Sequence, residues 1–424
     1  MGFYDWVCNK TIAESNKKNK IAMALYFCIL LVFLLNPFLA LILSVCLLFS
    51  RRTSDMQVTF CLVVISLFWG LLAFTQKSLA KEDTDCIRYY ISFGVYESMD
   101  PIKALSSLKF SKILNFVFTP VTVFLVSLTK NVQIMSFFWT FLVYLLTFLS
   151  MRHLLSYFWC YDQRNFAKMV IAQMLCFMAF VQISELLKQS AAFAVFFYGF
   201  TFFITGGGVC LSLLLVLCAI GIHPSVLMLL PLFLYKKVKI EWLFIVLVLV
   251  FALSLLTNII DLVMSFLPST TYFSLLLGKY GGHVGVQTAT LHYVLIQLIM
   301  LFFALFMLVK NRCWEVENMV KIVLLYLTIS FINYYNLTAY LRFAIFSHWI
   351  MGLILIMYIK FNYLTYSLWS MKKMFLTLMF LMTLRWTIAR TLTNGGYCSS
   401  YMDNSITNII VSPSFEYLSV DYEK

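Results

Sequence analysis

Long runs of apolar residues constrain this chain more than any other feature. Residues 242–256 form one such run, without a single charged side chain. A transmembrane helix needs about 20 predominantly apolar residues, and many stretches of this chain approach that length. Only 12% of the 424 residues are charged, whereas about 25% are charged in a typical soluble domain. This balance excludes a soluble enzyme, a nucleic-acid-binding protein, a disordered chain and a disulfide-rich scaffold.

The pattern predicts an all-α polytopic membrane protein. The strands of a membrane β-barrel alternate apolar and polar residues, which these unbroken runs do not do. We expect about 11–14 transmembrane or re-entrant helices of the length that a bilayer requires. The candidate segments are residues 21–50, 58–76, 110–128, 132–150, 169–187, 190–205, 209–235, 242–260, 291–309, 319–335, 341–359 and 374–388.

The first and third of these segments each contain a proline and leave an alternative open. Residues 21–50 carry Asn36 and Pro37, so they form either one kinked span or two short helices. Residues 110–128 carry Pro120, and they either cross the membrane or enter it and return.

Charge divides the chain into regions and sets its orientation. The net charge is +13, and cytoplasmic loops of membrane proteins carry an excess of Lys and Arg. We expect a polar segment (1–20), a helical bundle (21–388) and a polar tail (389–424). The expected cytoplasmic loops hold the basic clusters at Arg51 and Arg52, 152–168, 236–239, 310–312, and Lys360 with Lys372 and Lys373. These clusters share one side if residues 110–128 do not cross the membrane fully. The outer regions are then 77–109, 185–190, 261–290, 336–342 and the tail 389–424, and the side of the N-terminus stays open.

Cysteine usage argues against metal or redox chemistry. Most of the 11 cysteines lie inside apolar runs, and none forms a C-x-x-C pair. A disulfide between Cys86 and Cys398 is the remote alternative. Asp83 and Asp85 form a D-x-D pattern without other metal-ligand context, so we expect no metal and no cofactor.

An ionisable side chain at membrane depth costs free energy of insertion, so such residues usually have a function. Four short polar clusters of this chain are therefore candidate functional sites. The first follows the second apolar segment and holds Asp83, Asp85, Arg88 and Tyr89. Carboxylates accept protons and bind sugar hydroxyls, and aromatic rings give sugars a stacking surface. The alternative is a solvated loop with interfacial tyrosines.

The second cluster lies between two apolar segments. Gln182, Glu185 and Gln189 share one helical stripe, with Lys188 three residues after Glu185. We expect this stripe to line a cavity. The alternative is a short loop with a Glu–Lys pair.

The third and fourth clusters contain single ionisable groups. His223 precedes Pro224 inside residues 209–235, which form either one kinked helix or a hairpin with His223 at its tip. Histidine titrates near neutral pH and suits proton transfer. Arg342 opens a late span on the outer side, where guanidinium binds phosphate with two parallel hydrogen bonds. Structural roles, as a satisfied core histidine and an interfacial arginine, are the alternatives.

Together these clusters resemble the EpsG family, relatives of Wzy-type oligosaccharide repeat-unit polymerases. The matching patterns are D-x-D-x-x-R-Y-x-x-x-F (83–93), Lys188-Gln189 at the start of a span, Φ-H-x-S-Φ-L (222–227), and Arg342-Phe343, supported by Asp100-Pro101, Asn131 and Gln133. The family pattern usually has Arg-Gln at positions 188 and 189, and lysine keeps the charge without the two-pronged donor.

The resemblance implies an activity and a site. The protein would join undecaprenyl-pyrophosphate-linked oligosaccharide units into an extracellular, capsular or O-antigen polysaccharide at a bacterial inner membrane. Candidate bases are Asp85, Glu185 and His223, and candidate substrate-binding residues are Asp83, Arg88, Tyr89, Lys188, Gln189 and Arg342. The implied partners are these lipid-linked oligosaccharides, membrane lipids, and chain-length regulator and flippase proteins, without nucleic acid.

Two other functions fit the same features. A flippase for lipid-linked oligosaccharides would also have a basic cavity, but its charged groups would run through both leaflets. A glycosyltransferase that uses a polyprenyl-phosphate sugar would share the site on the outer side. The ionisable groups of this chain cluster near the outer ends of the spans. Residues 83–93, 182–189, 223 and 336–342 should therefore line an outward-facing lateral cavity, and this placement favours the polymerase.

Overall fold

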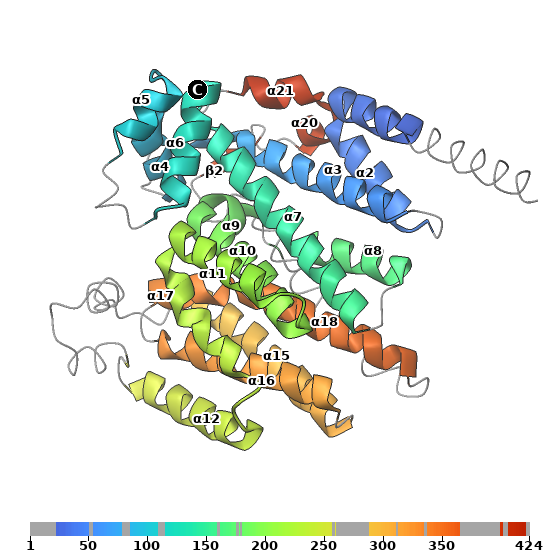
Figure 1. The fold of residues 1–424 in the computed structure, drawn as a ribbon, viewed down its shortest axis with the longest axis vertical. Helices are drawn as coiled ribbons and strands as arrows, with labels where there is room; N and C mark the ends of the chain where they lie inside the picture. Colours follow the sequence, from blue (N-terminus) through green and yellow to red (C-terminus); the bar gives the residue numbers. More distant parts are fainter. Residues whose placement is uncertain are drawn as a thin grey trace, which may run out of the picture.

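Within the described part of the chain, three helices are long and apolar enough to cross a membrane: α3 (Asp55–Phe74), α7 (Ile134–Tyr157) and α10 (Leu187–Thr205). The computed structural model describes residues 23–50, 54–78, 85–108, 115–158, 162–174, 178, 180–256, 259, 288–310, 313–334, 337–364, 399–401 and 406–420. α3 packs against α7 and α7 against α10, whereas α12 and α15 pack on α16 beyond α10 (Figure 1). An all-α polytopic membrane protein is therefore confirmed.

The remaining elements lie before, between and after these three helices in the chain (Figure 1). They are a helix at Met23–Leu35, α2 (Pro37–Leu48), β1 (Gln76–Ser78), α4 (Asp85–Gly94), α5 (Pro101–Ser106), α6 (Phe118–Thr129), α8 (Gln163–Ala172), α9 (Phe180–Glu185), α11 (Val209–Ile222), the 3₁₀ helix η3 (Pro224–Leu234), α12 (Ile240–Leu256), α15 (Thr288–Lys310), α16 (Trp314–Ile332), α17 (Leu337–Ala344), α18 (Ser347–Leu364), β2 (Ser399–Tyr401), α20 (Ile406–Val411) and α21 (Ser414–Ser419).

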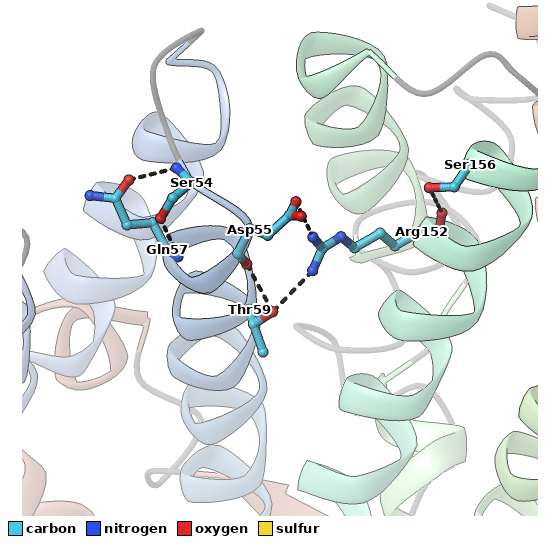
Figure 2. A network of polar contacts seen from close by, with 6 residues as sticks. All are labelled: Ser54, Asp55, Gln57, Thr59, Arg152 and Ser156. Carbon is cyan, nitrogen blue, oxygen red and sulfur yellow. Dashed lines mark hydrogen bonds and ion pairs between the residues drawn. The ribbon is translucent and has the colours of Figure 1, made fainter. Parts of the chain in front are cut away.

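Polar contacts define one end of the bundle, which we call the basic end. The Arg152 guanidinium, near the end of α7, binds the Asp55 carboxylate and donates to Thr59 Oγ1 at 2.9 Å, both on the first turns of α3 (Figure 2). Lys360 on α18 pairs with Glu315 on α16 at 2.7 Å and lies over the Phe158 ring. Arg152 and Lys360, two of the basic residues predicted to share one side of the membrane, thus both lie at this end.

Contacts between the same helices define the opposite end, which we call the site end. The Gln133 amide, just before α7, donates to the Phe74 carbonyl at the end of α3 (2.6 Å). Glu97 accepts from the Val132 N–H at 2.6 Å, which fixes the turn after α4 against the start of α7. Asp100 caps α5 by accepting from the Ile102 N–H at 3.0 Å. Asp100 therefore caps its own helix, and Gln133 joins the ends of α3 and α7.

The interface between α3 and α7 depends on a glycine. A Cβ atom at Gly70 would lie 2.8 Å from the Phe137 carbonyl oxygen and 3.0 Å from the Phe141 Cβ. Small residues allow this close approach of helix backbones in membranes.

Gly70→Ala is therefore expected to destabilise the fold. The α7 backbone has to move away, and overpacking of this kind costs about 1–3 kcal/mol of unfolding free energy. The midpoint of thermal unfolding in detergent measures the effect. The control is Gly207→Ala in the turn after α10, where the nearest atom is a side-chain oxygen at 3.3 Å. Equal midpoints for the two variants would contradict the close-contact argument.

The N-terminal segment forms two short helices and not one kinked span. Tyr26 contacts Phe60 with ring centroids 4.5 Å apart, whereas Phe38 contacts Phe68 further along α3. Helix Met23–Leu35 therefore runs in the direction of α3, and α2 returns in the opposite direction. Asn36 at the tip has an extended backbone, and its side chain caps α2. Met23 thus lies toward the basic end.

Residues 209–235 also form a hairpin, with His223 at its tip. α11 has 14 residues and η3 has 11, so the arms are about 21 Å and 22 Å long. Tyr235 at the end of η3 contacts Phe200 and Phe203 near the end of α10. The chain therefore returns to the basic end and crosses only part of the roughly 30 Å apolar core.

One predicted span is wrong in its detail. Residues 169–187 do not form one helix, because α8 ends at Ala172 and α9 begins at Phe180. Of residues 110–128, the structure describes 115–128, which hold the 12-residue α6, about 18 Å long; the Val117 N–H just before α6 donates to the Gly221 carbonyl of α11. α6 is too short to cross the membrane alone.

The C-terminal tail is partly docked on the bundle. β2 pairs antiparallel with β1, and the Asn36 amide donates to the Ile410 carbonyl at 2.9 Å. Tyr417 on α21 is fully buried. Residues 1–20, most of the loop 261–290, the segment 374–388, Asp83 and Cys398 lie outside the described residues.

Candidate functional site

A cavity at the site end brings together four segments that are far apart in the sequence. It measures about 200 Å³ and is lined by Tyr89, Leu186, Lys188, Gln189, His223 and Arg342. These residues come from α4, the start of α10, the tip of the α11–η3 hairpin and α17. Each of the four polar clusters found in the sequence therefore contributes to one cavity.

Aromatic rings hold the Lys188 ammonium in this cavity. Lys188 Nζ lies 4.3 Å from the ring centroid of Tyr89 and 5.1 Å from that of Phe118. Phe118 stacks on Trp139, whose indole N–H donates to Thr122 Oγ1 at 3.0 Å. Cation–π contacts of this kind stabilise a positive charge away from bulk water.

Hydrogen bonds at the hairpin tip fix the tautomer of His223. The Ser225 backbone N–H donates to His223 Nδ1 at 3.2 Å, and the Ser225 hydroxyl lies 2.7 Å from the same nitrogen. A backbone N–H only donates, so Nδ1 carries a lone pair and the proton of the neutral ring is on Nε2. In this state His223 is a hydrogen-bond donor through Nε2.

Arg342 reaches the cavity from the short helix α17. The Gln189 side chain, at the start of α10, donates to the Arg342 carbonyl at 3.0 Å. Gln189 was predicted to bind substrate; the structure shows that its amide nitrogen binds the α17 backbone. Arg342 and Lys188 place two positive charges around the same 200 Å³ of space.

A family model covers most of this chain. The model of the EpsG family matches residues 58–402, which include all four segments of the cavity. The chain belongs to the EpsG family. Members of this family are Wzy-type polymerase-like proteins, so the chain is a polysaccharide-polymerase-like protein of the membrane. No curated protein and no solved structure matches it.

Not every predicted site residue of this EpsG-family chain lines the cavity. Arg88 is exposed on α4, and its neighbour Tyr89 lines the cavity instead. Asp85 begins α4 beside it, with its side chain outside the described part, as is all of Asp83.

The predicted stripe of Gln182, Glu185 and Gln189 is interrupted. Leu186 is non-helical, with φ −100° and ψ 46°, so α9 ends at Glu185 and α10 begins at Leu187. Glu185 is 7% exposed and directly precedes Leu186, which lines the cavity. The break explains how α10 presents Lys188 and Gln189 at its first turn.

A group of polar residues behind the cavity was missed by the sequence analysis. Gln297 on α15 is buried and hydrogen-bonded to Tyr326, Ser330 and Tyr340. The signal was a lone glutamine in an apolar segment, together with Tyr326 and Ser330 four residues apart on one helix face.

The described residues offer cations and no metal-binding cluster. No group of three His, Cys, Asp or Glu side chains in the described part of the chain is arranged to hold a metal ion. The cavity combines Lys188, Arg342 and an N–H donor at His223, which suits a ligand with several negative oxygen atoms.

Proposed function

We propose that this EpsG-family protein joins oligosaccharide repeat units carried on a polyprenyl pyrophosphate, at the outer leaflet of a bacterial inner membrane. A sugar hydroxyl of one unit attacks the anomeric carbon of a lipid-linked chain. The new glycosidic bond forms as the bond to the lipid pyrophosphate breaks, and the hydroxyl proton passes to a base. The product is an extracellular polysaccharide of the capsule or O-antigen class.

The observation that carries this proposal is the pair of cations in one cavity. A departing pyrophosphate develops negative charge on its bridging oxygen, and fixed positive groups lower the barrier for that step. Lys188 is held by rings, and Arg342 is held by the backbone contact from Gln189. Both charges are thus in place before the substrate arrives.

In this proposal, His223 is a hydrogen-bond donor and a carboxylate is the base. The Nε2–H of His223 supports a role as a donor to the leaving pyrophosphate. The base is then a carboxylate, for which Asp85 and Glu185 are the candidates because both lie beside residues that line the cavity. Tyr89 provides an aromatic face for a sugar ring next to Lys188.

The experiment that tests the activity uses purified protein in nanodiscs with lipid-linked repeat units. Polymerisation produces a ladder of longer lipid-linked glycans and releases free polyprenyl pyrophosphate. In cells that lack the protein, single units accumulate on the outer face. Accumulation on the inner face, with no ladder in vitro, would replace the polymerase by a flippase.

Polymer formation is expected to continue in excess EDTA. Lys188 and Arg342 already supply the positive charge that a divalent metal would otherwise bring to the leaving group. Ladder length with and without chelator measures this. Abolition by EDTA with rescue by Mg²⁺ or Mn²⁺ would assign a metal-binding role to Asp83 and Asp85.

A further inference from the structure

A buried polar cluster lies behind α17, the helix that carries Arg342. We call it the Gln297 cluster; it consists of Gln297, Tyr326, Ser330, Tyr340 and Ser347. Tyr340 donates to Gln297 Oε1 at 2.8 Å, and Gln297 Nε2 donates to Ser330 Oγ at 2.8 Å and to Tyr326 Oη at 3.3 Å. Four helices, α15 to α18, meet in this cluster.

The cluster binds α17 on both sides of Arg342. Tyr340 contacts Gln297 from within α17, and the Tyr326 hydroxyl donates to the Phe343 carbonyl at 3.1 Å. Ser347, at the start of α18, lies 2.6 Å from the same hydroxyl. Gln189 holds the carbonyl of Arg342 itself. Residues 340, 342 and 343 are thus each fixed by a different helix.

These contacts matter because α17 has only eight residues. An isolated helix of that length is not stable, so its position is set by its neighbours. Gln297 is fully buried, and a buried polar network with its hydrogen bonds made is rigid and specifies one arrangement. The network therefore fixes the backbone of α17, which carries Arg342.

We propose that Gln297 and Tyr326 are positioning residues, which act through α17 to hold Arg342 in the cavity. The expected effect of these two residues on turnover rests on the proposed function. Two-pronged recognition of a phosphate group requires a fixed guanidinium orientation. A displacement of about 1 Å costs up to about a hundredfold in rate.

Tyr326→Phe tests this, because it removes the hydroxyl that binds Phe343 and keeps the ring. We expect turnover to fall at least about tenfold, in the range that misplacement of a catalytic group produces. The matched control is Tyr144→Phe on α7, a buried hydroxyl with no hydrogen-bond partner in the described part of the structure. Its turnover should stay within about twofold of wild type, since no hydrogen bond is lost. Tyr340→Phe provides the same test if Tyr326→Phe is not recovered from membranes.

A double-mutant cycle separates positioning from a general structural role. In an Arg342→Lys background the two-pronged contact is already lost, so Tyr326→Phe should have little further effect on turnover. If Tyr326→Phe lowers turnover equally in both backgrounds, the cluster does not act through Arg342 and the proposal is overturned.

A chemical readout tests the position of Arg342 without any polymerase assay. Phenylglyoxal modifies arginine, and peptide mass spectrometry follows each site in the purified full-length protein. Tyr326→Phe should change the modification rate of Arg342 and leave that of Arg152, which lies at the basic end, unchanged. An unchanged rate at Arg342 overturns the proposal. A changed rate together with full polymerisation by Arg342→Lys supports the positioning and removes Arg342 from the proposed reaction, whereas a changed rate in a protein that makes no glycan ladder supports the positioning and refutes the proposed function.

Discussion

Replacement of Arg342 by lysine is expected to shorten the polymer and lower turnover by about ten- to a hundredfold. Lysine keeps the charge but loses one of two parallel hydrogen bonds, and a charge-assisted hydrogen bond contributes about 1.5–3 kcal/mol. At about 1.4 kcal/mol for each tenfold change in rate, this gives the stated range. Polymer length in cells at matched expression, and turnover in nanodiscs, measure it.

Lys188→Arg is the matched comparison for this experiment. Lys188 contacts the faces of Tyr89 and Phe118, and a guanidinium group also stacks on aromatic rings. We therefore expect activity near wild type or slightly above it. If Arg342→Lys also makes full-length polymer, Arg342 is an anchor at the membrane surface, because lysine extends to the interface equally well. Its role in the site would then be withdrawn.

Loss of His223 is expected to have the largest effect of all. His223→Ala removes the Nε2–H donor, and loss of one preorganised hydrogen-bond donor to a developing negative charge lowers enzymatic rates by about 10²–10³-fold. His223→Asn should be equally inactive, although its Oδ1 still accepts from the Ser225 N–H and preserves the cap on η3.

Thermal unfolding separates these two histidine variants. His223→Asn should unfold near the wild-type midpoint, whereas His223→Ala loses a cap that contributes about 1 kcal/mol. If His223→Asn polymerises normally, the histidine is only a structural cap of the hairpin. The leaving group would then depend on Lys188 and Arg342 alone.

The long spans could be predicted from the sequence because their length alone specifies them. α3, α7 and α10 coincide with apolar runs that match the thickness of a bilayer. The meeting of four polar clusters in one cavity was also predictable, since polar groups at membrane depth need a shared polar space.

Other features depend on contacts between distant segments, which apolar length does not encode. Residues 209–235 have enough apolar residues for one span, and only the contact of Tyr235 with the end of α10 shows that the chain returns. The break at Leu186 contains no proline or glycine to indicate it. Gln189 and Gln297 look like ordinary polar residues until their partners on α17 are known.

The N-terminal hairpin has a consequence for biosynthesis. Its tip is held by a hydrogen bond between Asn36 and Ile410, residues separated by 374 positions. The Ser414 hydroxyl likewise binds the Phe33 carbonyl at the same tip. During translation the hairpin therefore leaves the ribosome 374 residues before Ile410 is available to contact it. Throughout that interval two arms too short to span the bilayer must be kept at the membrane by α3 or by an insertion chaperone.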